Sequence, residues 1–161
     1  MSLLTAPNNK IWDPSNVAVI ATFSLSIPMT TLSAMADEAD IKTNKIRLHG
    51  IDAPETKQTC KINNENWFCG KQSTKELKNL INNQKVECVT NDVDRYNRYI
   101  AVCFVNEINI NQWMVKNGWA IAYRYYSRDY VVEEEYANDK KLGIWKSEFI
   151  EPYAYRRQNK N

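Results

Sequence analysis

The chain has a single histidine, His49, and none of its four cysteines falls in a Cys-x-x-Cys pair. Structural zinc sites use closely spaced Cys and His ligands, so the sequence argues against a zinc centre. Internal repeats and low-complexity tracts are also absent. With 161 residues, of which 43% are hydrophobic and 25% charged, the composition is that of one globular domain with a single core.

The chain also lacks a large excess of charge of either sign. Lys and Arg number 21 and Asp and Glu 19, which leaves a net charge of +2. So small a charge permits a polyanionic partner but does not by itself indicate one. Five Trp and nine Tyr offer stacking surfaces, although most aromatic residues of a globular protein lie in the core or are half-buried.

The N-terminal segment differs in character from the rest. Residues 1–15 show no apolar period and contain several turn formers, which predicts a disordered terminus. Asn16–Ala36 carries no charge and ends in Ala-Met-Ala, a small-x-small pattern typical of a secretory signal with cleavage after Ala36.

Two alternatives for this segment stay open. The segment could be an uncleaved export anchor, although Pro28 and the many Ser and Thr residues make it a poor membrane span. Residues 17–25 could instead be a strand of the domain. We expect a leader over 1–36, a domain over 37–161 and a protein exported to the periplasm or the medium.

The remaining chain alternates apolar patterns of two kinds. Leu77, Leu80 and Ile81 recur at helical spacing, whereas the runs around Val86 and Val102 are rich in β-branched residues. The patterns predict helices over 70–82, 110–117 and 130–141, strands over 45–51, 85–89, 99–105 and 119–126, and a polar loop over 56–70. This order predicts an α+β fold with a small barrel.

The stretch KIRLHGIDAPE, residues 45–55, carries the clearest chemical pattern. An alternating strand breaks at Pro54, which places Arg47, Asp52 and Glu55 at the end of the strand and in the turn after it. An Arg can grip phosphate, one carboxylate can hold a hard divalent cation, and another can position or deprotonate a water. A solvated turn is the alternative that spacing alone leaves open.

The four cysteines form two pairs of near neighbours. Cys60 and Cys69 close a short loop, and Cys88 and Cys103 fall on the two arms of a predicted hairpin. The spacing predicts two disulfides, which agrees with an exported protein. Four reduced thiols in a cytosolic protein are the alternative.

Three motifs together resemble one family. The strings IRLHGIDAPET, DRYNR at 94–98 and NGWAIAYRYY at 117–126 are similar to the staphylococcal nuclease (thermonuclease) family, in that family's order. The resemblance runs from about residue 45 to about residue 155. It implies an OB-fold, a five-stranded Greek-key β-barrel with about three helices.

The resemblance also implies a phosphodiester site. Arg47 and Arg98 would flank one phosphate and stabilise the charge of the transition state. Asp52 and the backbone carbonyl of Ala53 would hold Ca²⁺, and Glu55 would orient the attacking water or take its proton.

The sequence departs from the family in one place. The upstream Asp-Gly-Asp-Thr motif, whose second Asp is a metal ligand, is absent. Asp37 and Asp40 lie near the expected position and are the candidates to replace it. Solvated residues near a new N-terminus are the other interpretation of both.

Substrate binding is implied for two further groups. Tyr123 and Tyr125 are two residues apart, so on a strand they would share a face on which a base could stack. Arg95 and Tyr96 match the loop beside the second Arg. No residue is expected to recognise base edges, so we expect DNA and RNA as partners with little sequence specificity, and a monomer without an obligate protein partner.

The leading hypothesis is therefore an exported, Ca²⁺-dependent endonuclease. The alternative is a catalytically impaired OB module that only binds nucleic acid, because the Asp-Gly-Asp-Thr motif is missing. A third possibility is that roughly the first 36 residues are not native to the domain. Arg156, Arg157 and Lys160 are expected to form a solvated basic end.

Overall fold

The strand at the centre of the fold is β7 (Tyr99–Val105), whose alternating sequence buries Ala101, Cys103 and Val105 on one face. A computed structural model describes residues 17–18 and 44–159 of the chain. Within them β7 pairs antiparallel with β6 (Val86–Val93) and parallel with β2 (Asn44–Leu48). The predicted hairpin of 85–89 and 99–105 is thus confirmed, with Asp94–Arg98 as its turn.

Short strands extend this sheet and flank it. β1 (Val17–Ala18) pairs parallel with β2, and β8 (Ile108–Asn109) pairs antiparallel with β7. A separate pair, β3 (Ile51–Asp52) with β9 (Ile121–Ala122), is antiparallel and aligns Asp52 with Ile121. The α+β class is confirmed, and the arrangement is consistent with an OB-like fold, although the described pairings form an open sheet rather than a closed barrel.

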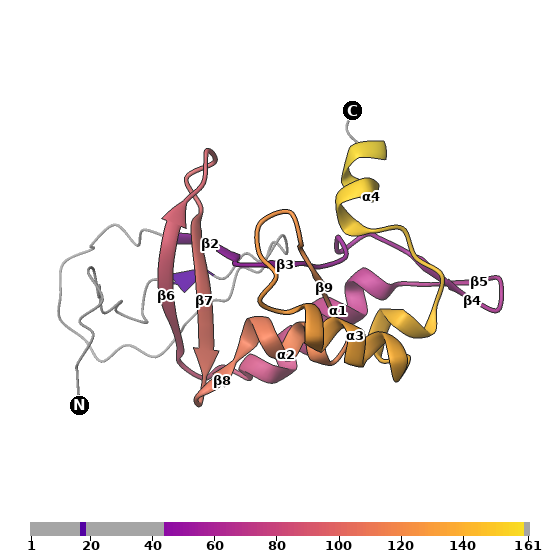
Figure 1. The fold of residues 1–161 in the computed structure, drawn as a ribbon, viewed down its shortest axis with the longest axis horizontal. Helices are drawn as coiled ribbons and strands as arrows, with labels where there is room; N and C mark the ends of the chain where they lie inside the picture. The colour runs from indigo at the N-terminus through magenta and orange to yellow at the C-terminus, as the bar shows by residue number, and fades with distance from the viewer. Residues whose placement is uncertain (1–16, 19–43, 160–161) are drawn as a thin grey trace, which may run out of the picture.

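The three predicted helices are present. They are α1 (Cys69–Ile81), α2 (Ile110–Lys116) and α3 (Val131–Asp139), followed by a short 3-10 helix, η2 (Gly143–Lys146). Figure 1 shows these helices gathered at one side of the β6–β7 hairpin. Leu77 of α1 and Met114 of α2 are fully buried in the core cluster that also contains Leu48 of β2.

Three expectations about the elements were wrong. The predicted polar loop contains a hairpin, β4 (Cys60–Ile62) with β5 (Glu65–Trp67). The predicted strand over 119–126 keeps only two strand residues, because the N–H groups of Tyr126 and Ser127 turn back to the carbonyl of Tyr123. A fourth α-helix, α4 (Pro152–Gln158), begins with proline at its first turn, where the missing N–H costs nothing.

Both predicted disulfides form. Cys88 and Cys103 are direct partners across the β6–β7 hairpin, with Cα atoms 4.1 Å apart. Cys60 and Cys69, with Cα atoms 5.7 Å apart, tie the β4–β5 hairpin to the start of α1. The second bridge therefore closes the loop that follows Glu55.

The start of α1 lies directly against the turn that carries Glu55. A Cβ atom on Gly70 would lie 1.8 Å from the carbonyl oxygen of Glu55, so only glycine fits at this position. The Gly70 N–H donates to the carbonyl of Gln58 at 3.1 Å, which holds the same turn from the other side.

Replacing Gly70 with Ala tests this contact. In an unhindered helix the change stabilises by about 0.5–1 kcal/mol, but here we expect a loss of about 1–3 kcal/mol through overpacking. The measurement is the free energy of unfolding in urea. Lys75→Ala, at an exposed position of the same helix, is the control and should leave it nearly unchanged. A Gly70→Ala protein as stable as the control would contradict the close approach.

Candidate active site

Arg47 lies against two tyrosine rings. It is half-buried on β2, which puts its side chain on the face opposite the buried Ile46 and Leu48. Its guanidinium carbon lies 5.7 Å from the ring centroid of Tyr123 and 5.3 Å from that of Tyr126. Cation–π contact of this kind orients an Arg while leaving its N–H groups available for an anion.

Asp52 is the most buried charged group of the site. Its carboxylate is only 2% exposed, where β3 ends. Oδ2 accepts from Nη2 of Arg156 at 2.9 Å, Oδ1 forms an ion pair with Nη1 of the same guanidinium at 2.9 Å, and the backbone N–H of Tyr153 also donates to the carboxylate. Burial raises the pKa of the Asp52 carboxyl, although the hydrogen bonds and charge of Arg156 and the charge of Arg47 act in the opposite direction.

Glu55 lies in the turn after β3 and shares the same partner. Its Oε1 accepts from Nη1 of Arg156 at 3.1 Å, and its side chain is 25% exposed, so water can reach it. The fully buried Gln58 fixes this turn: its side-chain oxygen accepts the Glu55 N–H at 3.2 Å and its amide donates to the Ile150 carbonyl at 2.7 Å. Sequence analysis missed Gln58, because nothing in the local pattern distinguishes it from a loop residue.

Arg156 corrects the expectation of a solvated basic end. It lies on α4 and bridges Asp52 and Glu55, and its side chain is 25% exposed. Burial acts to lower the pKa of its guanidinium, but hydrogen bonds to Asp52 and Glu55 and their charges raise it overall. Burial thus decides the direction of the pKa shift for Asp52 but not for Arg156, because the Asp52 side chain is 2% exposed and the Arg156 side chain 25%.

Arg98 is held within the hairpin turn. Its Nε donates to Oδ2 of Asp94 at 2.7 Å, its Nη2 forms an ion pair with the same oxygen at 2.6 Å, and the backbone N–H groups of Tyr96 and Arg98 donate to Oδ1. Arg47 is aligned with Ile100 in the parallel β2–β7 pair, and Arg98 precedes Ile100 by two residues. Arg98 thus lies in the turn directly before β7, next to the strand that pairs with the one carrying Arg47.

The predicted substrate residues form two exposed aromatic surfaces. At the hairpin turn, Tyr96 is 61% exposed, with the guanidinium carbons of Arg95 and Arg98 at 4.9 and 5.4 Å from its ring centroid. The second surface is a tyrosine cluster comprising Tyr123, Tyr125, Tyr126 and Tyr153. In this cluster the rings of Tyr125, Tyr126 and Tyr153 lie 6.3, 5.1 and 6.2 Å from that of Tyr123.

Tyr125 and Tyr126 extend this surface into solvent. Tyr125 is 82% exposed, and Tyr126, which sequence analysis did not assign, is 59% exposed. Burial raises the pKa of the Tyr123 hydroxyl, and the negative charge of Asp52 raises it further, so Tyr123 stays neutral beside the carboxylate.

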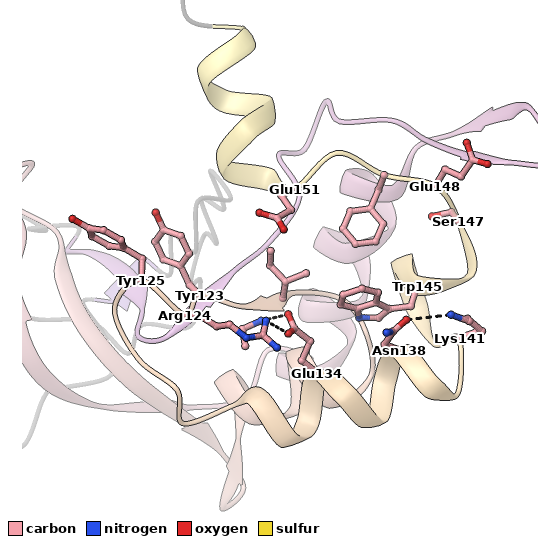
Figure 2. A pocket seen from close by; sticks show the side chains of 13 residues that line it. Tyr123, Arg124, Tyr125, Glu134, Asn138, Lys141, Trp145, Ser147, Glu148 and Glu151 are labelled. Atoms are coloured by element: carbon pink, nitrogen blue, oxygen red, sulfur yellow. Dashed lines mark hydrogen bonds and ion pairs between the residues drawn. The ribbon is translucent and has the colours of Figure 1, made fainter.

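A pocket of about 740 Å³ continues from Tyr123 away from Arg47. It lies between β9, α3, η2 and the segment before α4, and Figure 2 shows Tyr123 and Tyr125 at one end and Trp145 at the other. Glu134 is 4% exposed, pairs with Arg124, and accepts the Ala122 N–H at 2.9 Å. This pair closes the floor of the pocket and holds the chain that carries Tyr123.

The described residues partly fit a hard divalent cation. Asp52 and Glu55 supply the carboxylate oxygens that Ca²⁺ prefers. Both already accept hydrogen bonds from Arg156, and among the described residues no group of three His, Cys, Asp or Glu side chains could hold a metal ion. Asp37 and Asp40, the other candidate ligands, lie outside the described residues.

Comparison with known proteins shows which family the chain resembles. Residues 45–147 match the family model described as staphylococcal nuclease homologue. The matched region contains Arg47, Asp52, Glu55 and Arg98 but ends before α4 and Arg156.

Individual relatives carry nuclease names. An uncharacterized endonuclease of Haemophilus influenzae is 39% identical over 122 residues, which cover 74% of this chain and 64% of that protein. A micrococcal nuclease of Shigella flexneri is 33% identical, covering 74% and 72%. A probable staphylococcal-like nuclease, CAN2, of Oryza sativa subsp. japonica is 31% identical, covering 81% and 34%. The chain thus spans less than two thirds of the first and the last of these relatives.

The Asp94–Arg98 pair predicts a definite acid response. Partial burial acts to raise the pKa of Asp94, but hydrogen bonds from Arg98 and from the Tyr96 N–H hold it below its ordinary value. The stability that this pair contributes is therefore complete above the unfolded pKa of about 3.8 and is lost as the pH falls through the lower folded value.

Asp94→Asn removes this contribution at all pH values. We expect the wild type to lose more stability than Asp94→Asn between roughly pH 4 and pH 2, measured as thermal midpoints across that range. Asp92→Asn removes a carboxylate of the same hairpin outside the pair and should keep the wild-type acid response. Parallel curves for the wild type and Asp94→Asn would show that Asp94 does not anchor the turn.

Proposed function

The chain belongs to the family of staphylococcal nuclease homologues, and from that premise we propose that it hydrolyses phosphodiester bonds of DNA and RNA with little sequence specificity. The observation that carries the proposal is the convergence of Arg47, Asp52 and Glu55 beside the tyrosine cluster. A guanidinium, two carboxylates and exposed aromatic rings are what a phosphate, an attacking water and unstacked bases require.

The residues have separate roles in this mechanism. Arg47 binds the scissile phosphate, and Arg98, in the turn before β7, supplies the second positive charge for the oxygens on which charge builds. Glu55, a quarter exposed, takes the proton of the attacking water. Water attacks phosphorus, the P–O bond on the opposite side breaks, and the leaving oxygen takes a proton from solvent.

Asp52 and the Ala53 carbonyl are the groups of the described chain that would hold Ca²⁺, with the Glu55 carboxylate beside them. When bound, a divalent cation there would polarise a phosphoryl oxygen. Asp37 or Asp40 would complete the set of ligands.

Substrate binding would fall to the exposed rings. Tyr123 and Tyr125 would stack on one nucleotide, and Arg95 and Tyr96 would contact the backbone at the hairpin. Stacking on a ring uses the face of a base, which does not depend on the base or on the sugar. It therefore supports low sequence specificity and activity on both DNA and RNA.

A second candidate function rests on Arg156. Because it neutralises both carboxylates, the domain could bind nucleic acid through Arg47 and the tyrosine cluster without cleaving it. Binding that weakens with salt, in the absence of cleavage, would select this function.

We also propose that the protein is exported and acts as a monomer. Two disulfides are compatible with an exported monomer. No helix within the described part of the chain has both the length and the apolar character to cross a bilayer.

Glu55→Gln tests the catalytic role directly. The amide cannot take a proton, so we expect cleavage of plasmid DNA and of RNA to fall by about 10²–10⁴-fold, with little change in the affinity for a short single-stranded oligonucleotide. The control is Glu76→Gln, on α1 outside the site. Undiminished cleavage by Glu55→Gln would exclude Glu55 as the base.

Chelation tests the cation requirement. We expect EGTA to abolish cleavage and added Ca²⁺ to restore it, while oligonucleotide binding persists in EGTA because Arg47 and the rings supply it. Gel-based cleavage and fluorescence anisotropy measured on the same samples separate the two. Full cleavage in EGTA would contradict the role given to Asp52.

A further inference from the structure

Arg156 uses the carboxylate oxygens that a cation would need. Nη2 donates to Oδ2 of Asp52 at 2.9 Å, and Nη1 donates to Oε1 of Glu55 at 3.1 Å and forms an ion pair with Oδ1 of Asp52 at 2.9 Å. One guanidinium therefore bridges the two carboxylates at the position proposed for the ion.

Charge and burial support the same conclusion. Asp52 is 2% exposed, and an ionised carboxylate so deeply buried requires a positive partner. Arg156 faces it with both terminal nitrogens, one donating a hydrogen bond and the other forming an ion pair, and charge-assisted contacts of this kind are stronger than neutral hydrogen bonds. A divalent cation at the same oxygens would bring the guanidinium into direct repulsion with a second positive charge.

The element that carries Arg156 is lightly attached. α4 has seven residues, of which only Pro152 is buried, and Arg157 and Gln158 are exposed. Figure 1 shows it projecting from the body of the fold. Besides Arg156, its contacts with the site are the Tyr153 N–H to Asp52 and the Tyr153 ring at 6.2 Å from Tyr123. The preceding segment is anchored separately, by Gln58 to Ile150.

We propose that Arg156 is an internal counter-cation that competes with a divalent metal ion for Asp52 and Glu55, so that docking of α4 and binding of the ion exclude each other. The inference rests on the proposed function only for the position of the ion. Since coupling between two binding events is reciprocal, the ion releases α4 to the same degree that α4 weakens the ion.

Calcium affinity is the first test. Arg156→Gln removes the competing charge, so calorimetry should give at least about fivefold tighter Ca²⁺ binding than the wild type. Ca²⁺ should also raise the thermal midpoint of Arg156→Gln more than that of the wild type, because the ion replaces the missing partner of Asp52. The matched control is Arg157→Gln, which removes the neighbouring exposed charge and should bind Ca²⁺ as the wild type does.

Hydrogen exchange gives a readout on α4 itself. In the wild type, Ca²⁺ should accelerate amide exchange over residues 153–158, while exchange in α1 stays unchanged. In Arg156→Gln, exchange over these residues should be fast already and insensitive to Ca²⁺.

Arg156→Lys is a second variant that tests the proposal if Arg156→Gln does not fold. Arg156→Lys keeps the charge but loses the fork, so its Ca²⁺ affinity should fall between those of the wild type and Arg156→Gln. Equal or weaker Ca²⁺ binding in the folded Arg156 variants would overturn the proposal and make Arg156 a positioning residue. Absence of Ca²⁺ binding in every variant up to about millimolar concentration would overturn it as well.

Cleavage of DNA by the same samples separates this inference from the proposed function. If the wild type cleaves with Ca²⁺ while the Arg156 variants do not bind it more tightly, the competition fails and the nuclease assignment stands. If Arg156→Gln binds Ca²⁺ more tightly but neither protein cleaves, the competition stands and the nuclease assignment fails.

Discussion

The pairing of Asp52 with Arg156 is the interaction on which the site depends. A carboxylate that is almost sealed from water is tolerable only with a charged partner. The partner is 104 residues away in the sequence, so burial of Asp52 obliges the end of the described chain to fold back over β3. The turn carrying Glu55 then lies against the same guanidinium, and Tyr153 is brought to the tyrosine cluster.

A second layer of contacts fixes the opposite side of the site. The Tyr123 N–H donates to the Gly50 carbonyl at 2.8 Å, which joins the turn after β2 to the end of β9. Glu134 holds the neighbouring Ala122 from α3. The backbone pairing of short strands therefore brings Tyr123 beside Arg47.

Much of this arrangement could be predicted from the sequence. An apolar stripe indicated α1, whereas α2 and α3 were indicated by the glycine that follows each helix and, for α3, by acidic residues at its start. Spacing indicated both disulfides because each joins near neighbours. The proximity of Arg47, Asp52 and Glu55 was implied by their closeness in the sequence, although the strand predicted over 45–51 is two strands, β2 and β3, separated by a turn at residues 49–50.

What escaped prediction depends on contacts between distant segments. Gln58 resembles an ordinary loop residue until Ile150 lies beside it, and Arg156 resembles a solvated charge until α4 packs over Asp52. Of the strand predicted over 119–126, only two residues are strand in the structure. The chain turns at Tyr123, and this turn places Tyr126 against Arg47, a contact that local propensity does not predict. The assignments of residues 1–36, Asp37 and Asp40 fall almost entirely outside the described residues and remain predictions.

The close approach of Gly70 to the Glu55 carbonyl has a consequence for how variation in this protein would be interpreted. A scan of random substitutions selected for cleavage would deplete every side chain at position 70, since even a methyl group collides with backbone. Depletion there would equal that at Arg47 or Glu55, although glycine offers no group to the reaction. Intolerance to substitution near this site can therefore reflect a steric constraint as well as a catalytic role. Only an assay that measures stability and turnover separately would distinguish the two.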